Sequence, residues 1–124
     1  MLLYMCMPLT LDVLSDGTRR HLVALLFAEQ TLCVCELVAA FDELQPVISR
    51  HLALLRDAGW VVARRDGRRM YYRLAHMPAW AELVLQGFVD GGVPRRAWKA
   101  TFARLTRFAG LPVRRARERL VSAS

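Results

Sequence analysis

The sequence has few cysteines, a single lysine and no long apolar run. Three cysteines, an odd number, do not supply the paired framework of a small secreted protein. No apolar stretch approaches the length needed to cross a membrane. The segment Met1–Leu14 is apolar but lacks the basic region and small-residue cleavage site of a signal peptide. These absences predict a soluble protein of the cytoplasm that does not bind membranes.

The basic residues are concentrated in two segments. Residues 45–74 carry a net charge of +5 and residues 95–124 carry +8, whereas residues 1–44 carry −4 and residues 75–94 carry −2. Arginine supplies all but one of the basic side chains, and its planar guanidinium suits phosphate and guanine. A genome rich in arginine codons would give the same preference over lysine, but it would not cluster the charges. The clustering therefore predicts an anionic partner.

Apolar residues recur at helical spacing along most of the chain. Helices are expected over Leu9–Leu14, after the N-cap candidates Ser15 and Asp16, over Cys33–Phe41, from Gln45 to Gly59, over Pro78–Asp90 and over Pro94–Phe108. The pattern changes to β at Trp60–Arg65 and Arg68–Leu74, with Asp66-Gly67 as a two-residue turn. This order of elements predicts a winged helix-turn-helix, a mainly α fold with a small β-hairpin.

Charge and periodicity together divide the chain into two parts. Residues 1–93 are expected to form a winged helix-turn-helix domain for DNA binding and dimerisation. Residues 94–124 are expected to form a basic amphipathic helical extension with a disordered end. The apolar stripe of this extension is expected to pack on the dimerisation helices. A chain of 124 residues buries a small core, which favours a homodimer.

The basic segment 45–74 coincides with the elements that a winged helix-turn-helix places on DNA. The second helix of the turn unit enters the major groove, and the hairpin reaches the neighbouring backbone or minor groove. On the expected helix, Ile48, Leu52 and Leu55 form the buried stripe. Candidate DNA contacts are Gln45 at the start of the helix, Ser49, Arg50 and Arg56 on the opposite side, and Arg64, Arg65, Arg68 and Arg69 at the hairpin. His51, next to the stripe, is expected to pack or bond to another helix.

The segment Leu32–Leu37, which reads Leu-Cys-Val-Cys-Glu-Leu, carries the most information about function. It resembles the inducer-binding motif C-V-C-[DE]-L of the arsenical-responsive repressors within the ArsR/SmtB family of winged-helix metal sensors. The likeness continues through Gln45–Arg56, and through Tyr72–Leu74 to Pro78–Ala81. The resemblance implies a homodimeric repressor that binds operator double-stranded DNA and releases it when As(III) or Sb(III) bonds to cysteine thiolates.

The same resemblance implies the ligand set. Cys33 and Cys35 match the motif, while Val38 stands where some members have a third cysteine. Cys6, from the same or the partner chain, is the candidate third ligand; the alternative is an incidental, partly buried cysteine. With at most three sulfurs and no nearby histidine, As(III) or Sb(III) fits better than a closed zinc site, with Cd(II) or Pb(II) next. No organic cofactor is expected.

The spacing of Cys33 and Cys35 suggests how a ligand could act on DNA binding. Two residues apart on a regular helix, the side chains point to nearly opposite sides. Holding one small soft ion with both thiolates therefore requires the start of the helix to unwind, which would disturb the DNA-reading pair of helices.

Other functions fit parts of the sequence. The thiol pair would also suit a repressor of the same fold that senses oxidants or persulfides. The segment 95–124 would suit a non-specific nucleic-acid binder. A cysteine-nucleophile enzyme is the weakest alternative, because His21, His51 and His76 show no recognised spacing to either thiol. We therefore predict a regulator and not an enzyme.

Overall fold

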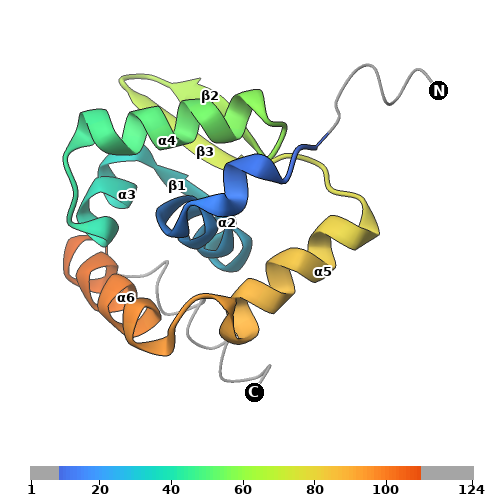
Figure 1. Cartoon of the computed structure of the whole chain (residues 1–124). Helices are drawn as coiled ribbons and strands as arrows, with labels where there is room; N and C mark the ends of the chain where they lie inside the picture. The colour runs from blue at the N-terminus through green and yellow to red at the C-terminus, as the bar shows by residue number, and fades with distance from the viewer. Residues whose placement is uncertain (1–8, 110–124) are drawn as a thin grey trace.

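The computed structural model describes residues 9–109, and Cys6 and the C-terminal end of the chain lie outside the described residues (Figure 1). In chain order the elements are η1 (Asp12–Ser15), α2 (Gly17–Glu29), β1 (Thr31–Cys33), α3 (Val34–Phe41), α4 (Gln45–Asp57), β2 (Val61–Asp66), β3 (Arg69–Leu74), α5 (Ala79–Gly87), η2 (Phe88–Gly92) and α6 (Arg95–Ala109). The predicted mainly α winged helix-turn-helix is confirmed. No helix within residues 9–109 is both long and apolar enough to span a membrane.

Side-chain and backbone caps set where the helices begin and end. Asp16 is the N-cap of α2, and its Oδ1 accepts hydrogen bonds from the backbone N–H groups of Thr18 at 2.8 Å and Arg19 at 3.1 Å. Pro46 lies in the first turn of α4, where its missing N–H leaves no bond unmade. Beyond α4, Gly59 has a φ of +89°, which a residue with a Cβ adopts at a cost.

The strand β1 is the main departure from the expected order of elements. A helix was expected from Cys33, but Thr31–Cys33 forms a short strand and the helix begins only at Val34. The strand pairs antiparallel with β3, so that Cys33 lies opposite Tyr71. The expected hairpin therefore becomes a three-stranded sheet in the order β1-β3-β2.

The hairpin turn is one residue later than the sequence suggested. Asp66 pairs with Arg69, so the two loop residues are Gly67 and Arg68, not Asp66 and Gly67. Of these two loop residues, only Gly67 has a positive φ, of +64°. Glycine in the first loop position with positive φ there is the pattern of a type II′ turn.

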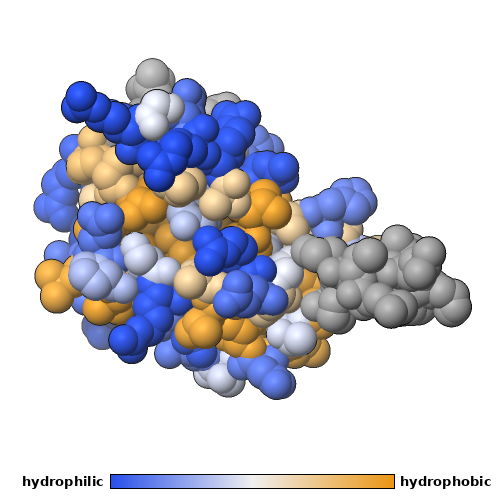
Figure 2. All heavy atoms as spheres, turned by 90° about the horizontal axis from the view of Figure 1, so that it is seen from above, coloured by the Kyte–Doolittle hydropathy of each residue, from blue (hydrophilic) through white to orange (hydrophobic). Residues whose placement is uncertain are grey.

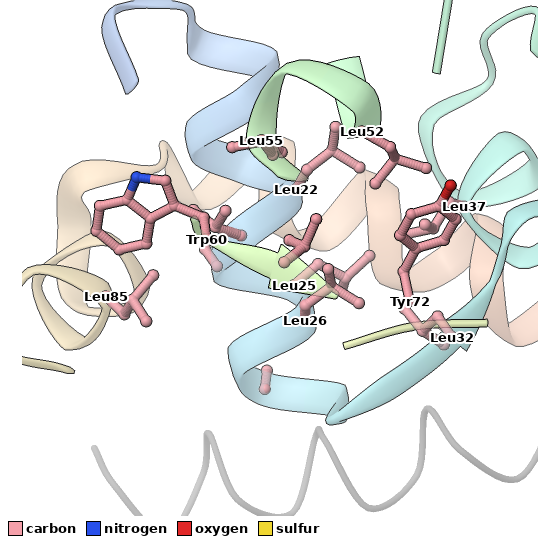
Figure 3. Close-up of a cluster of buried hydrophobic side chains, with 14 of the residues drawn as sticks. Leu22, Leu25, Leu26, Leu32, Leu37, Leu52, Leu55, Trp60, Tyr72 and Leu85 are labelled. Atoms are coloured by element: carbon pink, nitrogen blue, oxygen red, sulfur yellow. The ribbon is translucent and has the colours of Figure 1, made fainter. Parts of the chain in front are cut away.

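Helix α2 forms the centre of the core. Its side chains Leu22, Leu25 and Leu26 are fully buried, and Figure 3 shows them between α4 and the sheet, with Trp60 and Leu85 to one side. The indole Nε1 of Trp60 donates to the carbonyl of Thr10 at 2.8 Å, so this buried aromatic leaves no orphaned donor.

The last two helices lie on different parts of the molecule. Helix α5 continues into η2, a π-helical turn, and α6 packs along α3 (Figure 1). The predicted packing of the α6 stripe on the dimerisation helices is therefore wrong for the described residues, because Trp98, Phe102 and Leu105 are buried where α6 meets α3. The rest of the extension, residues 110–124, lies outside the described residues.

Candidate functional site

Helix α4 presents one apolar and one polar side, as expected. Ile48, Leu52 and Leu55 are fully buried against the core. All four residues predicted to contact DNA from this helix are exposed: Gln45, Ser49, Arg50 and Arg56. Arg56 lies 3.9 Å from the Asp57 carboxylate in an exposed ion pair, an interaction that water and salt weaken. The polar side is therefore accessible to a large partner.

The four arginines predicted at the hairpin also face solvent. Arg64 and Arg65 end β2, Arg68 lies in the turn and Arg69 begins β3, and all four are exposed. Figure 2 views the molecule from the side of α4 and the hairpin, and it shows hydrophilic side chains gathered along one edge of this face, with hydrophobic ones over much of the rest. Exposed guanidinium groups at this density favour an anion as the partner.

His51 forms the expected link to another helix. Its Nδ1 lies 3.2 Å from the guanidinium Nη1 of Arg19 on α2. The Nε of the same arginine donates to the carbonyl of Val13 at 2.6 Å. His51 therefore helps to hold α4 against α2.

The two motif cysteines lie at the start of α3, next to the hairpin. Cys33 is the N-cap, with φ −84° and ψ 163°, and its sulfur accepts from the backbone N–H of Glu36. In return the Glu36 carboxylate accepts from the backbone N–H of Cys33 at 2.9 Å. This reciprocal pair is a capping box with a thiol in place of the usual hydroxyl.

This geometry overturns the expectation that the two thiols point to opposite sides of one helix. Cys33 lies before the helix in extended backbone, and its interaction with the Cys35 side chain helps to raise the pKa of Cys33. Because only Cys35 is part of the helix, a ligand shared by the two thiols does not have to unwind it.

The two thiols differ in environment. Cys33 is 1% exposed, whereas Cys35 faces solvent. Burial, the hydrogen bond with Cys35 and the negative charge of Glu36 raise the pKa of Cys33 to about 12, and the backbone N–H of Glu36 only partly offsets this. Cys33 is therefore a protonated thiol at neutral pH, and Cys35 is the one of the pair that solvent reaches.

A third protein ligand is not found among the described residues. Within residues 9–109 no group of three or more histidines, cysteines, aspartates or glutamates is placed to hold a metal ion. Val38, at the position of the third cysteine in some relatives, packs against the core. Cys6, the candidate third ligand, lies outside the described residues.

Helix α6 holds the far end of the helix that carries the thiols. The Arg104 Nε donates to the carbonyl of Ala40, in the last turn of α3, at 2.8 Å. Beside this bond, the His21 ring makes edge contacts with Phe41 and Trp98, with ring centroids 4.7 and 5.1 Å away. The end of α3 opposite the thiols is thus fixed between α2 and α6.

Replacing Arg104 with glutamine is expected to lower the free energy of unfolding by about 1 kcal/mol, because the carbonyl of Ala40 loses a charged donor. Urea denaturation measures the change. The matched control is Lys99→Gln, which removes a charge from the exposed side of the same helix and is expected to change stability by less than about 0.5 kcal/mol. Equal losses in both variants would contradict the role given to Arg104.

Sequence reasoning missed the roles of Glu36 and Tyr71 at this site, and it predicted Arg69 only as a DNA contact. Glu36 completes the cap of α3, and the Ser/Thr-x-x-Glu pattern would have revealed it had cysteine been accepted as an N-cap. Tyr71 and Arg69 come close to the thiols only through the pairing of β1 with β3. A strand of three residues is too short to show the alternating pattern that predicts a strand from sequence.

The chain matches the family model described as "Bacterial regulatory protein, arsR family" over residues 16–62. It is 46% identical to the arsenic resistance transcriptional regulator ArsR1 of Pseudomonas putida over 67% of this chain and 66% of that protein. It is 49% identical to the arsenical resistance operon repressor of Escherichia coli over 59% of this chain and 63% of that protein. Regulator ArsR2 of P. putida is 43% identical over 82% of this chain and 87% of its own length. The chain belongs to the arsR family.

The arsR-family match places the helix-turn-helix and the thiol motif together. Residues 16–62 run from the N-cap of α2 to the start of β2, and they include both cysteines and the whole of α4. Members of the family are regulatory proteins and not enzymes, in agreement with the sequence-based prediction. The matched part spans slightly less than two thirds of the first two relatives' length. No solved structure matches this arsR-family chain.

Proposed function

We propose that this protein is a transcriptional repressor that binds operator DNA as a homodimer and releases it when As(III) or Sb(III) bonds to Cys33 and Cys35. Cys6 is the proposed third ligand. The observation that carries the proposal is the thiol pair at the N-cap of α3, the first helix of the helix-turn-helix, beside the arginine-rich hairpin. The names of the relatives, which are regulators and repressors of arsenic resistance, support the same function.

The proposed DNA contacts are the exposed polar side of α4 and the hairpin arginines. Gln45, Ser49, Arg50 and Arg56 would face the major groove, where arginine pairs with guanine and glutamine with adenine. Arg64, Arg65, Arg68 and Arg69 would contact phosphates or the minor groove.

The chemistry of the thiols favours a trivalent metalloid over a divalent cation. Two thiols condense with As(OH)₃ to give two As–S bonds and two water molecules, with one As–OH remaining, so no proton has to be released. A divalent cation such as Cd(II) or Pb(II) requires both thiols to lose their protons. That loss is costly for Cys33, because burial raises its pKa to about 12. Soft sulfur ligands also disfavour Mg²⁺ and Ca²⁺.

The proposed dimer surface is the outer side of α5. Trp80 and Leu83 on this helix are 45% and 74% exposed, and Leu11 near the start of the chain is 54% exposed. Large apolar side chains exposed together are typical of an interaction surface. A C₂ dimer through this surface would leave α4 and the hairpin of each chain free for two half-sites on DNA.

The test is operator binding with and without arsenite. A dyad-symmetric DNA fragment is titrated with the protein and the fraction bound is followed by gel shift or fluorescence anisotropy. Arsenite is expected to weaken binding about 5- to 150-fold, the usual range for coupling between two sites. A complex that arsenite does not affect would overturn the proposal.

The proximity of the two thiols also supports a second candidate, a thiol-redox repressor of the same fold. Mass spectrometry after treatment with oxidant or persulfide would then show an adduct or a Cys33–Cys35 cross-link that rises as DNA binding falls. Release by Cd(II) or Pb(II) but not by arsenite would instead identify a cation sensor.

A further inference from the structure

The outer face of the sheet joins the thiol site to the arginines of the hairpin. Directly opposed residues of antiparallel strands point to the same face, and successive residues alternate. Leu32 and Tyr72 form an opposed pair that is buried in the core. The next pair, Cys33 and Tyr71, therefore lies on the opposite, outer face of the sheet. Arg64 on β2 is also opposite Tyr71, so Cys33, Tyr71 and Arg64 form a row across this face.

Arg69 completes this row. It lies two residues before Tyr71 on β3 and so shares the outer face. The Tyr71 side chain raises the pKa of Arg69, mainly through hydrogen bonding. Arg69 and Cys33 are thus on the same face of the sheet, with Tyr71 between them.

The alternative route from the thiols to DNA, through movement of α3, is restricted at both ends. Near the thiols, Cys33 lies before the helix as its N-cap, so sharing a ligand with Cys35 does not require the helix to unwind. At the other end, Arg104 and the ring contacts of His21 hold the last turn. The outer face of the sheet has no comparable restraint, because Arg69 is exposed and Tyr71 is only half-buried.

We propose that Tyr71 is a positioning residue that transmits occupation of the Cys33–Cys35 site to Arg69 in the hairpin. The inference rests on the proposed function. The Cβ atoms of opposed strand residues lie about 4.5–5.5 Å apart, so the Tyr71 side chain borders the Cys33 sulfur. When both sulfurs share a ligand, the tyrosine has to give way, and Arg69 loses the hydroxyl that orients it towards a phosphate.

The matched pair Tyr71→Phe and Tyr72→Phe tests this role. Each variant removes one hydroxyl from β3, but on opposite faces of the sheet. Operator affinity is measured by fluorescence anisotropy with and without arsenite, and arsenite binding is measured separately by titration of free thiols. In Tyr71→Phe the fold-change caused by arsenite is expected to shrink about 2- to 30-fold while arsenite still binds. Tyr72→Phe is expected to respond as the wild type does.

The affinity of the arsenite-free variant provides a readout that loss of fold stability would not give. If the ligand acts by separating Tyr71 from Arg69, the Tyr71→Phe protein already resembles the ligand-bound state. Its operator affinity without arsenite is therefore expected to fall towards that of the arsenite-bound wild type, with no change in the midpoint of urea denaturation.

A second matched pair, Arg69→Gln and Arg68→Gln, tests the other end of the route. Both remove one exposed charge from the hairpin. Each is expected to reduce the slope of the logarithm of the binding constant against the logarithm of salt concentration by about 1 for each lost phosphate contact. Only Arg69→Gln is expected to reduce the fold-change caused by arsenite as well.

The outcomes separate this inference from the proposed function. A wild type that responds to arsenite together with a Tyr71→Phe variant that responds equally would overturn the role of Tyr71 and leave the repressor intact. A Tyr71→Phe variant that no longer binds arsenite would make Tyr71 part of the thiol site and would also contradict transmission. A wild type that arsenite does not release from DNA would overturn both.

Discussion

Replacing Cys35 with serine is expected to abolish the release of operator DNA by arsenite, a loss of the whole of an effect of about 5- to 150-fold. Cys35 is the exposed thiol of the pair, and it lies after the cap, in the first turn of α3. Removing its sulfur breaks the thiol pair and leaves only buried Cys33 and the proposed third ligand Cys6. DNA affinity without arsenite is expected to stay within about twofold, because no contact of α4 is changed.

Cys33→Ser is the sharper of the two variants, because the structure predicts that it keeps the fold. Serine is among the best N-cap residues, and with Glu36 three residues later it would complete a hydroxyl capping box. Helix α3 is therefore expected to be retained while arsenite response is lost. Cys33→Ala removes the cap as well and is expected to cost about 1 kcal/mol of stability in addition.

These variants are compared by operator binding with and without arsenite and by urea denaturation. Cys35→Ser, Cys33→Ser and Cys33→Ala are all expected to lose the response of DNA binding to arsenite. Only Cys33→Ala is expected to lose stability. Release of DNA by arsenite from either serine variant would show that the two sulfurs are not the ligands.

Lowering the pH from 7 to 4 is expected to remove about 3 kcal/mol of stability through His21 alone. His21 is 8% exposed, and burial, with a smaller effect of the Arg104 charge, lowers its pKa from 6.5 to about 4. Between about pH 6.5 and pH 4, His21 therefore binds a proton in the unfolded chain but not in the folded protein. The stabilising contribution is complete above pH 6.5 and is lost as the pH falls towards 4.

His21→Gln and His76→Gln separate this effect from other titrations. Both remove one imidazole, but His76 is exposed. Urea denaturation between pH 4 and pH 7 is expected to show the same pH dependence for the wild type and His76→Gln, and a weaker one for His21→Gln. If stability falls equally with pH in all three proteins, protonation of His21 contributes nothing to the pH dependence, and the role given to His21 is contradicted.

The helices that carry a full apolar stripe could be predicted from the sequence. Leu22, Leu25 and Leu26 on α2 and Ile48, Leu52 and Leu55 on α4 repeat at the helical period, and all six are buried. The DNA-facing candidates followed from the same period, because the side opposite a buried stripe is the exposed side. Their exposure agrees with the prediction, while their contacts with DNA remain proposed.

The thiol site could be predicted only in part. The motif identified Cys33 and Cys35, but their geometry depends on where the helix begins, and a helix boundary is decided by a few local hydrogen bonds. Here the capping box with Glu36 and the pairing with β3 leave Cys33 outside the helix. The partner strand is nearly forty residues later in the chain, so no local pattern could have indicated it.

The packing partner of α6 could not be predicted either. The amphipathic pattern of a helix predicts that one side is buried, but it does not indicate which element covers that side. Arg104 donates to a carbonyl at the end of α3, and Trp98 contacts the ring of His21 on α2. Both contacts depend on three-dimensional placement.

The three-stranded sheet also bears on how the protein avoids aggregation. A sheet edge with free backbone groups can pair with another chain, and natural proteins protect edges by keeping them short or charged. Strand β1, at one edge, is only 3 residues long and passes directly into α3. Strand β2, at the other edge, ends in Arg64, Arg65 and Asp66. The more apolar β3 lies between them, shielded from edge-to-edge association by the short strand that carries Cys33 and by two of the arginines proposed to contact DNA.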